Sequence, residues 1–439
     1  MSGTKTGREK KLTRRERKAN ARQASGKKTR RERIDETNVT QGQKILRKFF
    51  SVLEPLRHVP AHGNREFFFD QYVGLLLIHF YNPMVSSLRA MQEATDIESI
   101  QEIIGVPKMS LGAMSESAAK VFRAEDLLPI IENVSGQVLE ASKAYSPKQF
   151  KELPGMPVAV DGTFLKCLPK MVWAVFRKKT DNRGVRLQLQ YDLAGNLPRA
   201  FEITAANGSE PASLKKLLQP GLLYLCDRGY IDYAMYQAVH EGGSFFVGRL
   251  KSDNAYEVVE DLPLSPKDRD ANVVADQVVA MGSKPTRGRL KARVRRVVIR
   301  LPDKPGHDIV LLTNTDLSAE MVAMMYRYRW QVELFFKWFK CILGGCKHWL
   351  SHSETGLTIQ VYAALLASML LTLWTGCKPN LSTFRMFQWY LMGWASEQNV
   401  QDAIRRHQAE QARKAAKKAE NEAKKQAEAA AKAAEKLAQ

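Results

Sequence analysis

Two aspartates follow short apolar runs, a position where a carboxylate could take part in chemistry. Asp161 follows residues 158–160 and precedes Gly162, and Asp227 follows residues 222–226. Ligand sites collect at the carboxyl ends of buried strands. However, an aspartate at a strand exit also commonly stabilises the next turn. Each aspartate taken singly is therefore a weak indication of a functional site.

A third carboxylate, Glu333, lies in a segment with helical periodicity over residues 326–343. At about 100° per residue, one arc of about 60° holds the polar side chains Tyr326, Arg329, Glu333 and Lys340, with Lys337 beside them. The opposite face is apolar and aromatic. On spacing alone, the simpler explanation of this polar stripe is a surface helix on which Glu333 forms ion pairs with Arg329 and Lys337. Each such pair is worth a few tenths of a kcal/mol.

The same residues carry a resemblance to a known family. The spacing Tyr326-x2-Arg329-x3-Glu333-x6-Lys340 resembles the Y-x2-R-x3-E-x6-K signature of bacterial insertion-sequence transposases of the DDE class and cut-and-paste type. The segments 160–163 and 226–230 resemble those that carry the first and second aspartates of that family, and residues 187–198 resemble its central hairpin. The resemblance covers roughly residues 45–375. Three separate segments agree with the family in the same order, which favours one common site for the three acids.

The resemblance implies an α/β fold with an RNase H-like catalytic core, an inserted β-rich subdomain and an N-terminal helical domain. In that family the first acid lies on the first strand, the second follows the fourth strand, and the glutamate lies on a later helix. The expected domains are a basic tail without fixed structure (1–40), a helical DNA-binding domain (41–150), the first part of the core (151–255), the β-rich subdomain (256–317), the second part of the core (318–395) and an Ala/Lys/Glu-rich helical tail (396–439).

The resemblance also implies DNA transposase activity, meaning cleavage at transposon ends and transfer of the freed strand into target DNA. Asp161, Asp227 and Glu333 are then both the catalytic residues and the metal ligands. Two Mg²⁺ ions about 4 Å apart can activate a nucleophile and stabilise a leaving alkoxide, and Mn²⁺ is the expected substitute. Carboxylates suffice as ligands because Mg²⁺ prefers oxygen. The residues expected to hold DNA phosphates are Tyr326, Arg329, Lys337 and Lys340.

The charge balance agrees with a polyanionic partner. The chain has 439 residues with 67 Lys and Arg against 46 Asp and Glu, a formal net charge of +21. Such an excess favours nucleic acid or an anionic membrane and does not by itself distinguish them. The resemblance specifies double-stranded DNA, as terminal inverted repeats and as target, bound by a homodimer, with no membrane partner.

The cysteines and the N-terminus indicate the compartment. The five cysteines include no CxxC pair, and the N-terminal segment is basic without an apolar core. These features predict reduced thiols in a cytoplasmic protein without a signal peptide. The resemblance implies association with the bacterial nucleoid. Residues 356–377 are apolar over a bilayer-spanning length, and we expect a buried core helix there.

Periodicity and turn residues predict the elements that must position the acids. The expected strands are 158–160, 172–176, 186–191, 201–204, 222–226 and 244–248, followed by a separate small β unit with strands 273–280, 294–301 and 309–313. Helices are expected at 211–218 and 233–240, and a turn at 194–196. Residues 44–150 are predicted to be helical, with a helix ending before Pro83.

The two ends of the chain and the N-terminal helices leave alternatives open. The segment 97–122 suits either a helix-turn-helix or an ordinary helical hairpin, because its second helix carries Lys120 as its single base. Residues 1–33, with fourteen Lys and Arg against three acids, suit a solubilising tail or an arm on DNA phosphates. The tail from about 408 has high helix propensity without a heptad seam, which predicts a solvated single helix.

Three rival functions need weighing. Cys341, Cys346, His348 and His352 resemble zinc ligands, but their spacing is much tighter than that of a zinc finger. A structure-selective nuclease on the same core would need the same acids, and strand transfer from pre-cut ends would separate it from a transposase. A domesticated DNA-binding descendant is expected to lack an acid, whereas all three are present.

Overall fold

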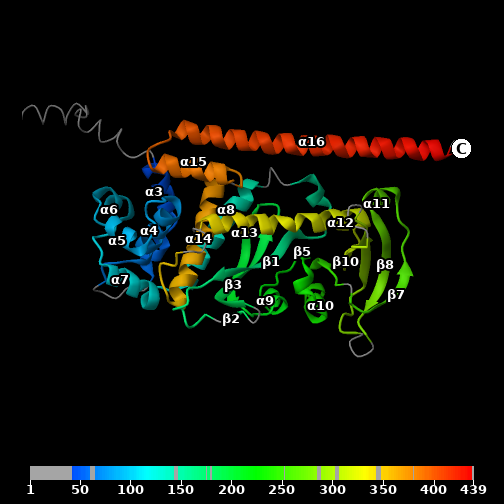
Figure 1. Ribbon diagram of the computed structural model, residues 1–439, viewed down its shortest axis with the longest axis horizontal. Coiled ribbons are helices and arrows are strands. Elements are labelled where there is room, and N and C mark those ends of the chain that lie inside the picture. The colour runs from blue at the N-terminus through cyan, green and yellow to red at the C-terminus, as the bar shows by residue number, and fades with distance from the viewer. Residues whose placement is uncertain are drawn as a thin grey trace, which may run out of the picture.

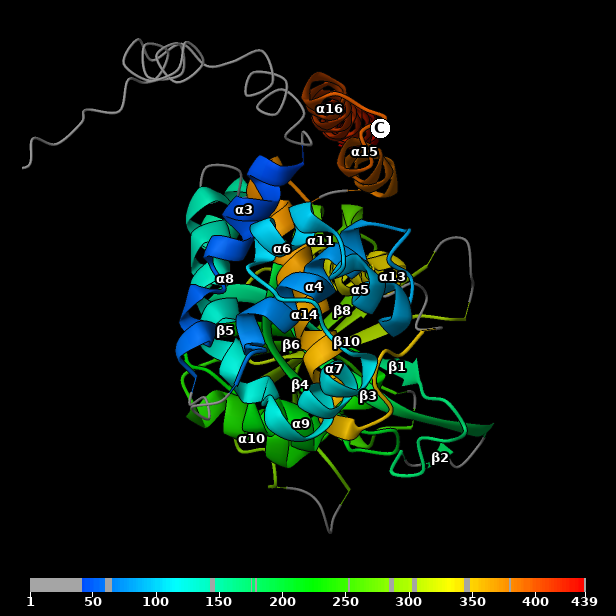
Figure 2. The ribbon, with the colours of Figure 1, turned by 90° about the vertical axis from the view of Figure 1, so that its left-hand side faces the viewer.

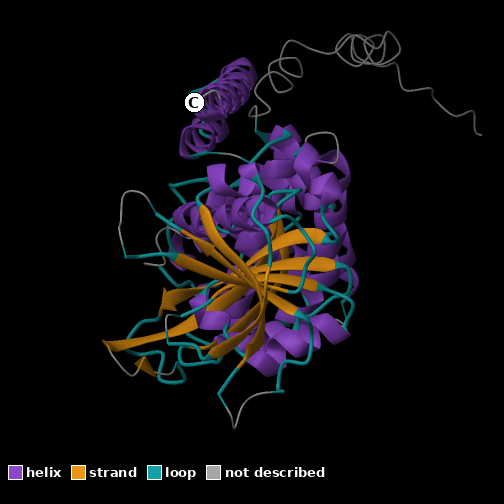
Figure 3. Cartoon of the chain, turned by 90° about the vertical axis from the view of Figure 1, so that its right-hand side faces the viewer, coloured by secondary structure: helices purple, strands orange, loops and turns teal. Residues whose placement is uncertain are grey.

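The computed structural model describes residues 42–59, 65–142, 147–174, 176–177, 180–251, 253–283, 288–301, 306–342, 348–378 and 380–437. Within them a twisted sheet lies between layers of helices (Figures 1 and 3). The mixed α/β class expected from the sequence is therefore confirmed. The basic tail over residues 1–40 lies outside the described residues.

The described strands form one continuous ten-stranded sheet in the order β2-β3-β1-β5-β6-β10-β9-β8-β7, with β4 paired to β3. The first part contains β1 (Met156–Lys166), β2 (Phe176–Arg177), β3 (Thr180–Asp192), β4 (Leu197–Ala205), β5 (Leu222–Cys226) and β6 (Phe245–Arg249). Strands β1, β5 and β6 are parallel, whereas β3 and β4 are antiparallel to their neighbours. The remaining strands are β7 (Tyr256–Asp261), β8 (Val273–Met281), β9 (Val294–Ile299) and β10 (Ile309–Thr313).

Two expectations about strands differ from the structure. The strands of residues 256–317 do not form a sheet of their own, because β10 pairs with β6 and extends the same sheet. The strand expected at 172–176 is reduced to β2, and Val172 lies in a turn with 78% of its surface exposed. Its apolar residues had suggested a strand, but residues 171–174 form a turn closed by the backbone bond from Ala174 to Met171.

Alternation along the strands divides the core between the two faces of the sheet. Ala159, Leu225 and Val247 pack on one face, which is covered by α8 (Leu128–Ser142), α13 (Trp330–Ile342) and α14 (Glu354–Thr375). Val160, Cys226 and Phe246 pack on the other, toward α9 (Glu210–Lys216) and α10 (Tyr233–Glu241). Helices α9 and α10 confirm the helices expected there.

Helix α14 is long and apolar enough to cross a membrane by length and composition, but 83% of its apolar window is buried inside the protein. It packs against α8, α4 and α13. Its side chains from Leu357 to Leu371 belong to the main core. The expectation of a buried core helix is therefore confirmed.

The N-terminal part is helical, as expected. Its helices are α3 (Gln43–Ser51), α4 (Phe69–Tyr81), α5 (Leu88–Ala94), α6 (Glu98–Ile104) and α7 (Leu111–Glu116), grouped at one end of the sheet (Figure 2). Helix α4 ends before Pro83. The second helix expected over 110–122 is shorter, because α7 ends at Glu116 and one π turn (Ser117–Val121) follows.

The C-terminal tail is one helix, α16 (Glu397–Leu437). It packs on α15 (Leu381–Leu391) and then runs along the long axis of the molecule (Figure 1). At 1.5 Å per residue its length is about 60 Å. The helix expected for this tail is confirmed.

Candidate active site

The two aspartates lie side by side at the point where the parallel pairing of β1 and β5 stops. Val160 is paired with Cys226 in the register, and Asp161 and Asp227 are the next residue on each strand. Both continue the alternate positions that face α13. Asp161 was expected to end its strand, but β1 continues to Lys166 because β3 remains its partner beyond Asp161.

The third acid reaches this point on the helices that cover the same face. A single helix was expected over 326–343, but the structure has α12 (Ala319–Tyr328) and α13, which meet at Arg329. Helix α13 packs against β1 (Figure 1). Val332 and Phe339 on its inner face are fully buried, as the pattern predicted. Glu333 lies in its first turn, on the half-exposed flank.

Arg329 lies among the three acids and is 8% exposed. Its Nη2 donates a hydrogen bond of 2.6 Å to Oε1 of Glu333, and its Nη1 is 3.9 Å from Oδ2 of Asp161. The hydroxyl of Tyr326 donates a 3.1 Å bond to Oδ1 of Asp227. These contacts bring together five of the seven site residues predicted from the sequence.

The pKa of Asp161 is raised to about 6, mainly by burial and also by the negative charges of Glu333 and Asp227, although the Gly162 N–H and Arg329 act in the opposite direction. Burial by itself would lower the pKa of Arg329. The negative charge of Asp227, the hydrogen bond to Glu333 and the negative charge of Asp161 instead raise it above its usual value. Burial and the charge of Asp227 raise the pKa of Tyr326 to about 12. The guanidinium therefore serves as the counter-ion of a crowded acidic cluster.

The two lysines expected to hold DNA phosphates, Lys337 and Lys340, lie farther along α13 than this cluster. Lys337 is exposed and its Nζ lies 5.5 Å from the ring centre of Trp330. Lys340 is half-buried. Among the described residues, no hydrogen bond or ion pair joins either lysine to the three acids, so the lysines extend a positively charged flank from the cluster along the helix. Arg329, expected to contact DNA, is instead buried between carboxylates.

Arg249 is a residue of this cluster that sequence reasoning missed. It ends β6, the third parallel strand, on the same face as Asp161 and Asp227, and its charge acts on Tyr326. Its Nε is buried without a hydrogen-bond partner. The alternation that places Val247 in the core could have predicted its direction. The guanidinium is suited to receive an anion.

The oxygen donors fit a hard divalent cation in their chemistry. Asp161 feels the charges of both Glu333 and Asp227, and the three acids already gather around a positive group. In the described part of the chain, no three acidic, His or Cys side chains are close enough together to form a metal site as they stand. Cys346 of the zinc alternative lies outside the described residues.

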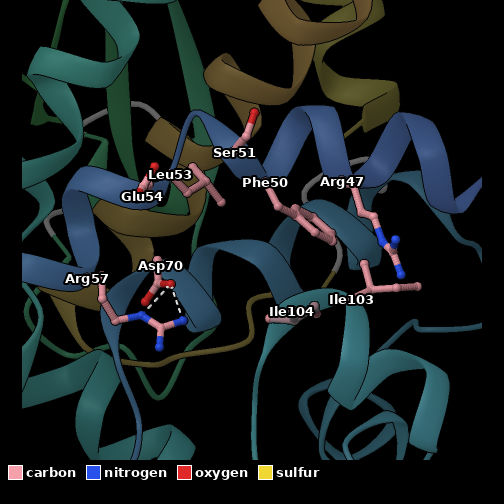
Figure 4. Close-up of a pocket in the computed structure, with 9 residues that line it drawn as sticks. All are labelled: Arg47, Phe50, Ser51, Leu53, Glu54, Arg57, Asp70, Ile103 and Ile104. Carbon is pink, nitrogen blue, oxygen red and sulfur yellow. Dashed lines mark hydrogen bonds and ion pairs between the residues drawn. The ribbon is translucent and has the colours of Figure 1, made fainter.

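A pocket of about 440 Å³ lies elsewhere, between α3, α4 and α6 (Figure 4). Its polar wall is the ion pair of Arg57 with Asp70, 2.6 Å apart. None of its lining residues belongs to the acidic cluster.

Comparisons with known proteins identify a matching family model and similar proteins. Residues 154–370 match the family model "Transposase DDE domain". A protein of Sinorhizobium fredii that carries the name transposase y4zB is 32% identical over 192 residues, covering 43% of this chain and 53% of that protein. This chain thus spans about half the length of that relative.

Two further similarities are more distant. The transposase of insertion sequence element IS5377 from Geobacillus stearothermophilus is 25% identical over 299 residues, covering 67% of this chain and 74% of that protein. The cryo-EM structure of a piggyBac transposase synaptic complex with hairpin DNA gives a TM-score of 0.40 at 10% identity, over 84% of this chain and 82% of that one. That structural likeness is too low to support an argument.

Proposed function

We propose that the chain is a DNA transposase that cleaves the ends of a bacterial insertion sequence and joins them to target DNA. The proposal starts from the match of residues 154–370 to the transposase DDE domain family. The observation that carries the proposal is the gathering of Asp161, Asp227 and Glu333 around Arg329. All three acids lie inside the matched range.

The proposed core is RNase H-like. In support, the strands run in the order β4-β3-β1-β5-β6, with three antiparallel members followed by two that are parallel to β1. The first acid lies on β1, the second follows β5, and the glutamate follows the segment that contains β7 to β10. We assign residues 41–150 to DNA binding and treat 256–317 as the insertion between the two parts of the core.

Asp161, Asp227 and Glu333 would hold two Mg²⁺ ions, with Mn²⁺ as a substitute. When bound, the metal would activate the attacking oxygen and stabilise the leaving alkoxide. The Tyr326 hydroxyl fixes the orientation of the Asp227 carboxylate. Arg329 compensates the negative charge of the three acids in the arrangement described above.

Phosphate binding is assigned to cations along the same face. Arg249 has an unpartnered buried Nε beside Tyr326, and Lys337 and Lys340 continue the charge along α13. A guanidinium can hold two phosphate oxygens at once, whereas an ammonium acts as a point charge. We propose that the protein acts as a homodimer on double-stranded DNA in the bacterial cytoplasm, at the nucleoid.

The direct test is cleavage of DNA that carries the gene with its flanking sequence. Purified full-length protein with Mg²⁺ is expected to cut at both borders, and EDTA is expected to stop the reaction. Pre-cut ends are then offered with a target plasmid. Joined products support a transposase, whereas cleavage without joining would support a structure-selective nuclease.

Replacing Tyr326 by Phe tests the orientation of Asp227. The variant loses one hydrogen bond to a carboxylate, worth about 1.5–3 kcal/mol, so the cleavage rate is expected to fall by about tenfold or more. Rates would be measured with saturating DNA. Tyr81→Phe is the control, because it removes a buried hydroxyl that donates to the carbonyl of Ala367 and not to an acid. Equal rates for the two variants would argue against the orienting role.

A further inference from the structure

Each of the two aspartates is followed within two residues by a glycine that faces the other side of the sheet. A Cβ atom at Gly162 would collide with the amide oxygen of Gln188 and lie 3.1 Å from Cδ of Arg186. A Cβ atom at Gly229 would overlap the carboxylate of Glu210. Neither glycine is among those with positive φ, so space and not backbone conformation excludes a side chain.

The groups that fill this space form two hydrogen-bonded pairs, and Arg186 of one pair acts electrostatically on Tyr230 of the other. We call the four residues the polar row: Arg186, Gln188, Glu210 and Tyr230. Arg186 donates a hydrogen bond to Glu210, and the hydroxyl of Tyr230 donates a 3.0 Å bond to Oε1 of Gln188. Gln188 and Tyr230 are 2% and 1% exposed. The row lies on the α9 face of the sheet, whereas the carboxylates lie on the α13 face.

The polar row links the backbone next to one aspartate with the backbone next to the other, in addition to the hydrogen bonds between the strands. Gln188 is the register partner of Gly162, directly after Asp161. Glu210 contacts Gly229, and Tyr230 follows in the same short 3-10 turn after Asp227. Asp161 also acts electrostatically on Tyr230. A shift of the row would therefore move the backbone that carries each aspartate.

The row is not an efficient way to stabilise a core. The Nε of Arg186 and the Nε2 of Gln188 are buried and have no hydrogen-bond partner. Native proteins leave few such groups, and each calls for an explanation. A set of polar side chains that retains unpaired donors fits a role in fixing the positions of metal ligands. Groups that contact metal ligands without touching the metal orient those ligands and tune the affinity for the metal.

We propose that the polar row is a positioning layer that sets the separation and direction of the Asp161 and Asp227 carboxylates for divalent metal binding. This inference rests on the proposed function, since it assigns the two aspartates to a shared metal site. Arg186, Gln188, Glu210 and Tyr230 act through the backbone at Gly162 and Gly229, and they touch neither metal nor DNA.

The test measures Mn²⁺ binding to the full-length protein without DNA, by the electron paramagnetic resonance signal of free Mn²⁺. Glu210→Gln keeps the shape of the side chain and removes its charge toward Arg186. Its dissociation constant for Mn²⁺ is expected to rise by about tenfold or more, the usual effect of changing a group behind a ligand. Asp161→Asn is the reference for a lost ligand.

Glu202→Gln is the matched control. Glu202 is 25% exposed against 20% for Glu210 and anchors the same helix, α9, through Lys216 and Ser213. The nearest groups to the two glycines are those of the polar row and do not include Glu202. Its variant is expected to bind Mn²⁺ as the wild type does. If Glu210→Gln and Glu202→Gln both lose Mn²⁺ affinity in proportion to the fall in their melting temperatures, the polar row only stabilises the fold. That result would overturn the proposal.

A second variant tests the path through Gly229. Gly229→Ala forces a methyl group into the Glu210 carboxylate and is expected to weaken Mn²⁺ binding. In Gly229→Ala combined with Glu210→Ala, the overlap is relieved, so the loss is expected to be no larger than for Glu210→Ala alone. Fully additive losses would contradict a shared path.

The outcomes separate the inference from the function on which it rests. If the wild type binds Mn²⁺ no better than Asp161→Asn does, the proposed metal site fails, and the inference fails with it. If the wild type binds Mn²⁺ and Glu210→Gln binds it equally well, only the positioning role is overturned.

Discussion

Asp161→Asn is expected to lower the rate of metal-dependent DNA cleavage by about a thousandfold or more. The substitution keeps the size of the side chain and the acceptor for the Gly162 N–H, but it removes the negative charge that would bind metal. Metal catalysis is worth several kcal/mol, and each 1.36 kcal/mol corresponds to about tenfold in rate. DNA binding, measured by mobility shift, is expected to remain close to that of the wild type.

Asp192→Asn is the matched control for this loss. Asp192 is also a buried aspartate at a strand end, and burial raises its pKa as it does that of Asp161. Its Oδ1 accepts hydrogen bonds from Ala194 and Gly195 in the turn after β3, an arrangement that an amide oxygen can preserve. Cleavage by this variant is expected to continue. Persistent cleavage by Asp161→Asn would remove the aspartate from the proposed site.

Asp276→Ala is expected to produce the largest loss of stability, about 3–5 kcal/mol in the free energy of unfolding. Asp276 and Arg295 are 6% and 7% exposed and form a two-bond ion pair between β8 and β9, with Nε of Arg295 3.1 Å from Oδ1 of Asp276. Without the aspartate, a buried guanidinium loses its counter-ion. Urea denaturation would measure the change.

The same pair links the sheet to the helices that carry Glu333. Nη1 of Arg295 donates to the carbonyls of Thr315 and Leu317, just before α12. Asp276→Leu with Arg295→Met is therefore expected to recover only part of the loss, since both carbonyls lose their donor. Asp316→Ala, which removes a 96% exposed partner of Arg293 at 3.7 Å, should change stability by less than about 1 kcal/mol. A similar loss for Asp316→Ala and Asp276→Ala would contradict the role of burial.

Much of the framework could be predicted from periodicity and turn residues. The buried strands β5 and β6, the helices α9 and α10 and the apolar helix α14 have clear local patterns, and the structure has each of them near its expected bounds. The merging of β7 to β10 with the main sheet could not be predicted. It depends on the pairing of β10 with β6, which joins residues more than sixty positions apart, and no local pattern encodes that pairing.

The candidate site, like the framework, could be predicted only in part from the sequence. Spacing predicted the residues, and the structure brings Asp161, Asp227, Tyr326, Arg329 and Glu333 together. Spacing could not predict that Arg329 lies buried between the acids, because helical angles give a direction and not a partner. Nor did it identify Arg249, since the end of β6 carries no motif. Its neighbourhood depends on the order of the strands in the sheet.

The junction at Arg329 also bears on when the site can exist during synthesis. Tyr326 contacts Asp227 from 99 residues farther along the chain, and Glu333 follows still later. Contacts between such distant segments form after local structure, because a long loop must close first. A partly synthesised chain that ends before Arg329 holds two neighbouring aspartates with neither their counter-ion nor the third acid. The groups proposed to cut DNA therefore cannot meet until the chain has been made past residue 333, so an incomplete chain is harmless to the DNA beside which it is made.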